Sequence, residues 1–205
     1  MLNSDAIRPD DPDAIPISGA QTSPPGIPAH EVQFYSGDEQ LYDTVLSFLA
    51  DGLRAAQPLV VIATERHRRA LKTGLAALGF DIEDIEYRRD VAFLDARDTL
   101  AAFMEGKVPN RELFYATVGN VLERVMRERT YLVARVCGEM VDLLYRDGNV
   151  DGALAVEDLW NELAERYAFS LLCAYSMDGF FTEAHAEVFG RICDRHMHVI
   201  TSRPV

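Results

Sequence analysis

The chain has 205 residues, of which 48% are hydrophobic and 26% charged, and its formal net charge is −13. This composition excludes wholesale disorder and provides enough apolar residues for the core of one domain. With 33 acidic against 20 basic side chains, direct binding to a nucleic acid or to an anionic membrane surface is disfavoured. A protein partner or a small ligand fits this charge better.

The cysteine pattern and the apolar runs predict a cytoplasmic protein. The chain has an odd number of cysteines, namely Cys137, Cys173 and Cys193. No two of them form a C-x-x-C pair, and each lies in an apolar stretch. That pattern is typical of buried thiols in a reducing compartment. No apolar run approaches the roughly 20 residues that cross a bilayer, and the amino-terminal segment does not read as a basic-then-apolar signal.

Composition divides the chain into a tail and one folded domain. Residues 1–29 hold six of the nine prolines and no aromatic residue, so they are predicted to form a disordered tail. From residue 30 onward, short apolar runs alternate with amphipathic stretches, which predicts a single domain over residues 30–200. Residues 201–205 are predicted to be a short carboxyl-terminal tail.

The elements of the predicted domain alternate regularly. Apolar runs predict strands at residues 32–35, 59–63, 91–94, 131–136 and 169–175. Helical periodicity predicts helices after residues 37, 64, 95 and 110, at 138–145, after 149, and at about 182–198. Strands separated by helices imply a parallel sheet covered on both faces. The predicted fold is therefore a three-layer α/β/α sandwich with a mainly parallel sheet of about five strands.

The turn after the first predicted strand does not read as a phosphate-binding loop. A nucleotide hydrolase needs a glycine-rich turn ending in Gly-Lys-Ser/Thr at this place. Here the chain reads Tyr35-Ser36-Gly37-Asp38-Glu39, and the two carboxylates would repel phosphate. The sequence also has no G-x-G-x-x-G or G-x-S-x-G turn. Phosphoryl transfer is disfavoured, and no cofactor is predicted.

Ligands of open parallel sheets bind outside the carboxyl ends of the strands. Polar side chains near those ends form the predicted ligand site, namely Tyr35, Thr64, His67, Asp95, Arg135, Glu139, Glu157 and Tyr175. Arg135 lies inside an apolar strand, where a charge must be paired. It is interpreted either as one half of an ion pair with Glu139, Glu157 or Asp95, or as a polar anchor at the floor of a ligand pocket. His67 is interpreted either as a helix-start residue or as a ligand contact.

Other candidate residues carry weaker signals. Cys193, His196 and His198 have a C-x2-H-x-H spacing that matches no familiar zinc arrangement, so no metal site is predicted. Cys173 and Tyr175 share one side of the last predicted strand and are expected in the core, with the tyrosine hydroxyl able to reach a pocket. Spacing alone assembles no Ser-His-Asp or Cys-His pair. No enzymatic activity is predicted.

Several landmarks occur together in a fixed order. They include Phe34-Tyr35, Val61-Ile62-Ala63-Thr64 with His67, Arg135 before Gly138-Glu139-Met140-Val141, Leu159-Trp160-Asn161, Leu171 to Tyr175, and Ile192-Cys193 with His196. Over residues 30–200 this order resembles the MEDS family, the methanogen/methylotroph sensory domain named partly for the repressor of dichloromethane dehalogenase. The resemblance implies a degenerate relative of RecA-like and circadian-clock ATPases. It also implies sensing of small molecules, such as small hydrocarbon derivatives, for attached or neighbouring regulators.

The residues and the resemblance together predict a stand-alone sensory domain, because the sequence shows neither a helix-turn-helix nor a kinase module. Such a domain would bind a small molecule at the strand ends and relay to a separate histidine kinase or transcription or sigma-factor regulator. A homodimer is compatible with that role. One alternative is a pure protein–protein adaptor with a vestigial pocket. Another is an enzyme of unrecognised chemistry that uses Glu139, His67 or Cys137.

Overall fold

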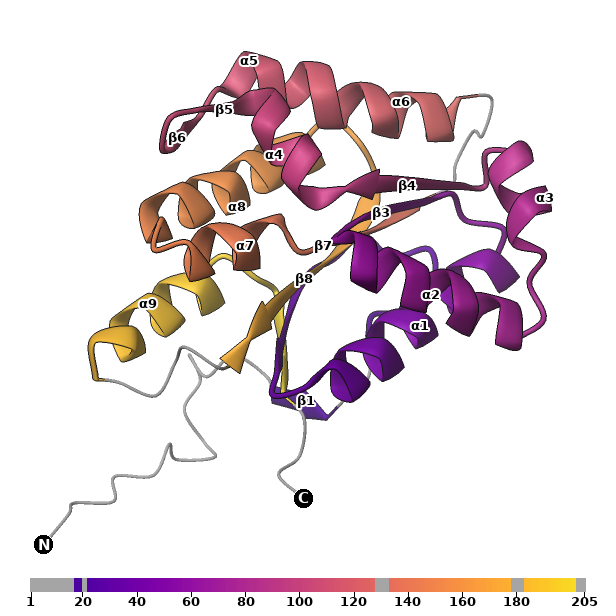
Figure 1. Cartoon of the computed structure of the whole chain (residues 1–205), viewed down its shortest axis with the longest axis horizontal. Helices are drawn as coiled ribbons and strands as arrows, with labels where there is room; N and C mark the ends of the chain where they lie inside the picture. Colours follow the sequence, from indigo (N-terminus) through magenta and orange to yellow (C-terminus); the bar gives the residue numbers. More distant parts are fainter. Residues whose placement is uncertain (1–16, 20–21, 128–132, 178–182, 202–205) are drawn as a thin grey trace, which may run out of the picture.

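The computed structural model describes residues 17–19, 22–127, 133–177 and 183–201, and a parallel sheet runs through the centre of this part (Figure 1). Over the described residues the sheet has seven strands, in the order β1-β9-β2-β8-β7-β3-β4. Neighbouring strands pair in parallel throughout. The strands are β1 (Ile17–Gly19), β2 (His30–Tyr35), β3 (Leu59–Ala63), β4 (Val91–Asp95), β7 (Ala134–Gly138), β8 (Phe169–Ser176) and β9 (His198–Thr201).

Helices cover both faces of the sheet, which confirms the predicted three-layer α/β/α sandwich (Figure 1). One face carries α1 (Asp38–Arg54), α2 (Glu65–Ala77) and α3 (Ile82–Tyr87). The other carries α4 (Ala96–Phe103), α5 (Arg111–Phe114), α6 (Asn120–Met126), α7 (Met140–Arg146), α8 (Val150–Ala164) and α9 (Glu183–Cys193). A hairpin of β5 (Met104–Glu105) and β6 (Val108–Pro109) follows α4, and a π-helical turn (Tyr115–Gly119) joins α5 to α6.

The continuous apolar runs of the sequence become the central strands. Every residue of β3, β7 and β8 is buried, as expected for parallel strands covered on both sides. Because side chains alternate along a strand, Val60 and Ile62 pack into the core below α4 to α9, whereas Val61 and Cys137 pack against α1 and α2. Two separate cores result, one on each face.

The sheet is wider than predicted, because β1 and β9 join it at one edge. The last predicted helix ends at Cys193, and the residues from His198 onward form β9. β9 pairs with β2 and also with β1, which lies within the segment predicted to be a tail. Thr201, placed in the carboxyl-terminal tail by the sequence, is the last residue of β9. Residues 202–205 and 131–132 lie outside the described part.

The prediction of a disordered tail over residues 1–29 is wrong for its described carboxyl-terminal part. Ser23 is buried, and its backbone N and hydroxyl donate to Glu31 Oε1 at 2.9 and 3.0 Å. The carbonyl of Ile27 accepts from the Ser170 hydroxyl, and that of Ala29 from Leu171 N. The hydrogen-bond partners of this segment belong to β2 and β8, so the composition of the segment itself did not indicate them. Residues 1–16 and 20–21 lie outside the described part.

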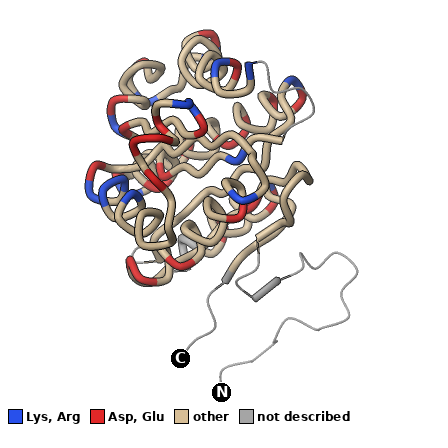
Figure 2. Tube along the Cα trace, turned by 90° about the vertical axis from the view of Figure 1, so that its right-hand side faces the viewer, with Lys and Arg blue, Asp and Glu red and all other residues tan. Residues whose placement is uncertain are grey.

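Acidic and basic residues are interspersed over the described body of the molecule (Figure 2). Several pairs bridge neighbouring elements, such as Lys72 with Glu86 at 2.7 Å and Arg195 with Asp158 at 2.8 Å. Among the described helices, none combines the length and the hydropathy needed to cross a membrane.

Candidate functional site

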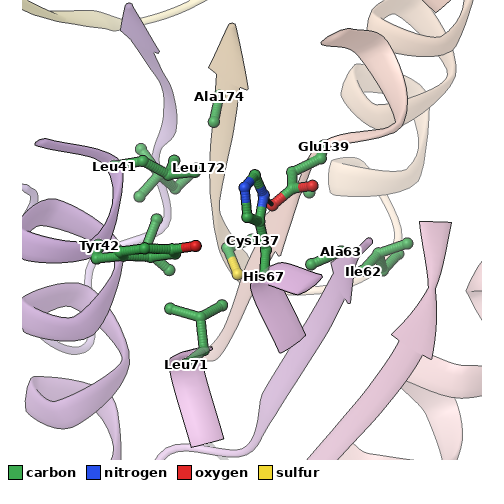
Figure 3. Close-up of a pocket in the computed structure, with 12 residues that line it drawn as sticks. Leu41, Tyr42, Ile62, Ala63, His67, Leu71, Cys137, Glu139, Leu172 and Ala174 are labelled. Atoms are coloured by element: carbon green, nitrogen blue, oxygen red, sulfur yellow. Dashed lines mark hydrogen bonds and ion pairs between the residues drawn. The ribbon is translucent and has the colours of Figure 1, made fainter. Parts of the chain in front are cut away.

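A carboxylate–imidazole pair lies where β3 and β7 end. Glu139 directly follows β7, and its Oε1 lies 2.5 Å from His67 Nδ1. Its Oε2 accepts from Thr64 N at 3.2 Å, and the Thr64 hydroxyl caps α2 by accepting from His67 N. The structure thus brings three predicted site residues, Thr64, His67 and Glu139, into one cluster at the carboxyl edge of the sheet. Figure 3 shows the His67 ring beside the Glu139 carboxylate.

Acidic groups lie on both sides of the His67 ring. Glu139 contacts Nδ1, and Asp38 Oδ1 lies 3.7 Å from Nε2. Burial alone would lower the pKa of His67, but Glu139 and Asp38 outweigh it, so this pKa is raised above 6.5. Arg66, which pairs with Asp38, lowers the pKa of His67 by its positive charge but does not reverse the rise. The Tyr42 ring meets the imidazole edge-on at 5.6 Å. The surroundings therefore favour the charged imidazolium.

The pair borders a narrow apolar slot between α1, α2 and the sheet. In Figure 3 the His67 ring faces the Glu139 carboxylate, with Leu41 and Tyr42 of α1 across the slot. Leu71 and Leu172 complete the apolar wall. The space open to the centre of a water molecule is about 10 Å³, which is room for about one water. A larger guest therefore requires α1 and α2 to separate.

Cys137 of β7 also lines this slot. It is buried, and burial together with the nearby Glu139 carboxylate raises the pKa of its thiol far above the ordinary range. Since the thiolate is the nucleophilic form of cysteine, Cys137 is a poor nucleophile here.

A second cluster lies on the opposite face of the sheet and is closed. Glu157 of α8 is fully buried, and its Oε1 accepts from the Tyr175 hydroxyl at 2.9 Å. Its Oε2 accepts from Cys173 Sγ at 3.3 Å and lies 3.2 Å from His30 Nε2. His196 Nε2 lies 3.5 Å from Oε1. Burial alone would raise the pKa of Glu157, but His196 and His30 hold it well below its usual range.

Glu157 and Tyr175 were predicted to share a site with His67, and the structure separates them from it. Tyr175 packs in the core under α7 to α9, whereas His67 belongs to the helix layer on the other face. The predicted same-side placement of Cys173 and Tyr175 on one strand is confirmed, since both contact Glu157.

Two further predicted residues lie at strand ends outside the His67 cluster. Asp95 caps α4 by accepting from Arg97 N and Asp98 N, and it also accepts from Arg68 at 2.7 Å. Burial works against these bonds, but they prevail and lower the pKa of Asp95. Tyr35 ends β2, where burial and the nearby carboxylates raise the pKa of its hydroxyl. Asp95 therefore serves as the N-terminal cap of α4, and Tyr35 is buried at the carboxyl end of β2.

Arg135 has neither of its two predicted roles. As the second residue of β7 it lies toward the amino end of the sheet, away from the slot. Its guanidinium donates to Gln57 Oε1 at 3.0 Å, to the Phe48 carbonyl at 2.7 Å and to the Ser23 carbonyl at 2.9 Å. It also stacks 4.5 Å over the Phe48 ring. Neutral oxygens and an aromatic face replace the expected carboxylate, because α1 and the amino-terminal segment surround this end of β7.

Sequence reasoning missed His30 and His196 as members of the second cluster. His30 opens β2, and His196 lies between α9 and β9. The sequence offered one usable signal, a glutamate within the apolar face of α8 beside Val156 and Trp160. Asp38 follows β2 and also flanks the His67 ring, but it was not among the predicted ligand residues.

The fold is that of a RecA-like α/β domain. The structure is similar to the crystal structure of a KaiC-like protein from the hyperthermophilic archaeon Pyrococcus horikoshii OT3, with a TM-score of 0.57 and 14% sequence identity, over 91% of this chain and 81% of that chain. At this identity the likeness concerns the fold alone. The chain belongs to the MEDS family, described as the methanogen/methylotroph, DcmR sensory domain, whose model matches residues 29–190. No curated protein sequence matches the chain significantly.

Proposed function

We propose that this sensory domain binds a small molecule in the slot beside His67 and Glu139 and relays its presence to a separate regulatory protein. The observation that carries the proposal is the buried carboxylate–imidazole pair at the edge of an apolar slot, where β3 and β7 end. Carboxyl ends of parallel strands are the usual ligand sites of open α/β sheets. Membership of a sensory family supports the same role.

The lining of the slot defines the chemistry of the ligand. Leu41, Leu71 and Leu172 offer apolar contact, while His67 and Glu139 offer one donor and one acceptor at one end. Such a lining suits a molecule of a few carbon atoms with a single polar atom, for example a short alcohol, aldehyde or halogenated methane. Small hydrocarbon derivatives of this kind are also what the family resemblance implies.

The size of the slot suggests how binding would become a signal. With room for about one water, the slot accepts a larger guest only when α1 and α2 move apart. A ligand that binds the open arrangement better than the closed one shifts the population toward it. The altered surface of α1 and α2 would then be read by a histidine kinase or a transcriptional regulator.

A binding role is favoured over catalysis at this site. Gly37 caps α1 and Asp38 is the first residue of α1, at the place where a nucleotide enzyme needs lysine and free amides. Cys137, which lines the slot, stays protonated because burial raises its pKa. We therefore propose that the domain is not an enzyme.

Thermal unfolding with a panel of short alcohols, aldehydes and halogenated methanes tests the ligand proposal. At least one class should raise the melting temperature saturably, because a ligand of the folded state stabilises it by mass action. Ala174 of β8 also lines the slot. Ala174→Leu, which fills the slot, and Glu139→Gln, which removes the carboxylate, should abolish that rise. Glu123→Gln, an exposed change on α6, is the control and should leave it intact. Equal stabilisation of Ala174→Leu would exclude this slot.

The relay is tested by affinity capture from cells that contain a kinase or transcriptional regulator partner. The yield of the partner should change when the stabilising compound is added, and Ala174→Leu should remove that change. Should the partner be captured equally under all conditions while no compound stabilises the chain, the adaptor alternative would replace the sensor.

A further inference from the structure

We infer that His30, Glu157, Cys173 and His196 form a binding site for a divalent transition metal, of which Zn²⁺ is the best match. One potential ligand atom from each residue lies within 4.8 Å of all the others, and all four residues are buried. They come from β2, α8, β8 and the segment between α9 and β9. This cluster is on the opposite face of the sheet from the slot, so the inference is independent of the proposed ligand.

The distances between the side chains resemble those of a tetrahedral metal site. His30 Nε2 lies 3.2 Å from Glu157 Oε2 and 3.5 Å from Cys173 Sγ, and the last two atoms are 3.3 Å apart. Zinc bonds of about 2.0–2.3 Å in tetrahedral geometry place neighbouring ligand atoms about 3.3–3.6 Å apart. Three of the four atoms therefore already have near-tetrahedral spacing.

Outer hydrogen bonds orient both imidazoles for coordination. His196 Nδ1 donates to the Ile192 carbonyl at 2.7 Å, which leaves Nε2 facing the cluster. His30 Nδ1 lies 2.8 Å from Asn161 Oδ1, and the Asn161 amide nitrogen donates to the Arg195 carbonyl, which fixes the amide orientation. Metal-binding histidines commonly donate their other ring nitrogen to a carbonyl in this way.

Two further contacts match a metal site. The Tyr175 hydroxyl donates to Glu157 Oε1, so that Oε2 remains as the coordinating oxygen. His196 Nε2 is buried and has no hydrogen-bond partner among the described residues. A metal ion would satisfy this nitrogen, which otherwise lies beside a carboxylate oxygen without a hydrogen bond.

The charges of such a site balance. On binding, the Cys173 thiol loses its proton to solvent and its sulfur forms a bond to the ion. The thiolate and the Glu157 carboxylate then neutralise the divalent cation, and both histidines coordinate as neutral imidazoles, any additional ring proton being released to solvent. Two nitrogens, one oxygen and one sulfur in tetrahedral arrangement are typical of zinc.

The ion would fasten the edge of the domain to its core. His196 lies two residues before the start of β9, so coordination ties β9 to β2, β8 and α8. A cavity of about 290 Å³, lined among others by His30, Trp160 and His196, borders the cluster and offers a path for the ion.

Titration of the chelator-stripped full chain with Co²⁺ tests the inference. One equivalent of Co²⁺ should give a thiolate-to-cobalt charge-transfer band and intense tetrahedral visible bands, and one equivalent of Zn²⁺ should abolish both. Cys173→Ser should lose the charge-transfer band. Cys137→Ser makes the same substitution at a buried cysteine of the neighbouring strand, facing the other core, and should keep it.

Two results would overturn the metal site. One is a wild-type spectrum with only weak octahedral bands. The other is an unchanged charge-transfer band in Cys173→Ser. Because the wild-type spectrum alone is decisive, the test does not depend on whether a variant folds. His196→Gln adds a second check, since it should weaken Co²⁺ binding at least about tenfold. Loss of an outer-shell partner of a ligand already costs about 10- to 100-fold in affinity, and loss of a ligand should cost no less.

Discussion

Two clusters in this domain combine a carboxylate with histidine, and they differ mainly in their position on the sheet. His67 and Glu139 lie at the carboxyl edge, where their side chains remain 11% and 9% exposed. Glu157 and His196 lie within the opposite core, and both side chains are fully buried. The strand end leaves the first pair near solvent, whereas α8 and the segment after α9 enclose the second.

This difference separates the roles that each cluster can have. A buried pair at the strand ends that borders a slot can exchange a small ligand and respond to pH. A fully buried carboxylate must keep its partners, because an unpaired charge in the core is strongly destabilising. We therefore expect the edge pair to serve sensing and the closed cluster to serve stability, through its own contacts and through the proposed ion.

Glu157→Ala should give the largest effect and tests the stability role of the closed cluster. Removing one partner of a buried ionic contact costs about 3–5 kcal/mol, and the Tyr175 hydroxyl would also lose its acceptor. The free energy of unfolding, measured by urea titration of chelator-treated protein, should fall accordingly. Glu165→Ala, at the exposed carboxyl-terminal cap of α8, should stay within about 0.5 kcal/mol. A small loss for Glu157→Ala would remove the distinction between the clusters.

Arg135→Met extends the comparison to a buried cation whose hydrogen-bond partners are neutral oxygens and not a carboxylate. The change removes the Arg135 donor from the Gln57 side chain and from the Phe48 and Ser23 carbonyls, and a buried group left unpaired costs about 1–3 kcal/mol. Urea unfolding should show a loss of at least that size, while stabilisation by slot ligands persists. Arg124→Met, an exposed change on α6, is the control. Loss of ligand response at equal stability would restore the pocket role that the sequence suggested.

The sequence predicted the features that depend on local pattern. Five strands, the helices between them and the caps at Thr64 and Asp95 follow from periodicity and residue type. The rule that ligands bind at strand ends also placed Thr64, His67 and Glu139 together, because β3 and β7 are neighbours that end at the same edge.

The features that depend on contacts between distant segments were not predictable. Arg135 bonds to Ser23, 112 positions away in sequence, and His30 meets Cys173 across 143 positions. No spacing rule relates such residues, and the sequence had set the segment around Ser23 aside as a tail. The last helix was predicted to continue to His198, the first residue of β9, because Cys193 and His196 fit one helical face.

Glu139→Gln tests the response of the edge pair to pH. Because Glu139, with a smaller contribution from Asp38, raises the pKa of His67 above 6.5, the resulting stability is fully present below pH 6.5. It is lost as the pH rises through the raised pKa. Arg66 and Tyr42 face the same ring and do not reverse this sign.

The melting temperature of the wild type should therefore fall more steeply than that of Glu139→Gln as the pH rises above 6.5. The difference should be worth about 1 kcal/mol, as for one hydrogen bond. His67→Asn should flatten the profile in the same way, and Glu123→Gln should not. Parallel profiles for wild type and Glu139→Gln would show that the pair does not control the charge of His67.

Asp38→Asn should give the smallest effect and tests whether the second carboxylate beside His67 matters. Asp38 is partly exposed and pairs with the exposed Arg66, so its contribution should be about 0.2–1 kcal/mol. Glu39→Gln is the matched control, because Glu39 lies in the same first turn of α1 and interacts similarly with the helix dipole. The excess loss in Asp38→Asn over Glu39→Gln should shrink in 1 M salt, where surface charges are screened beyond about 3 Å. An excess that persists in high salt would mean that Asp38 is shielded from solvent, and the edge pair would then resemble the closed cluster.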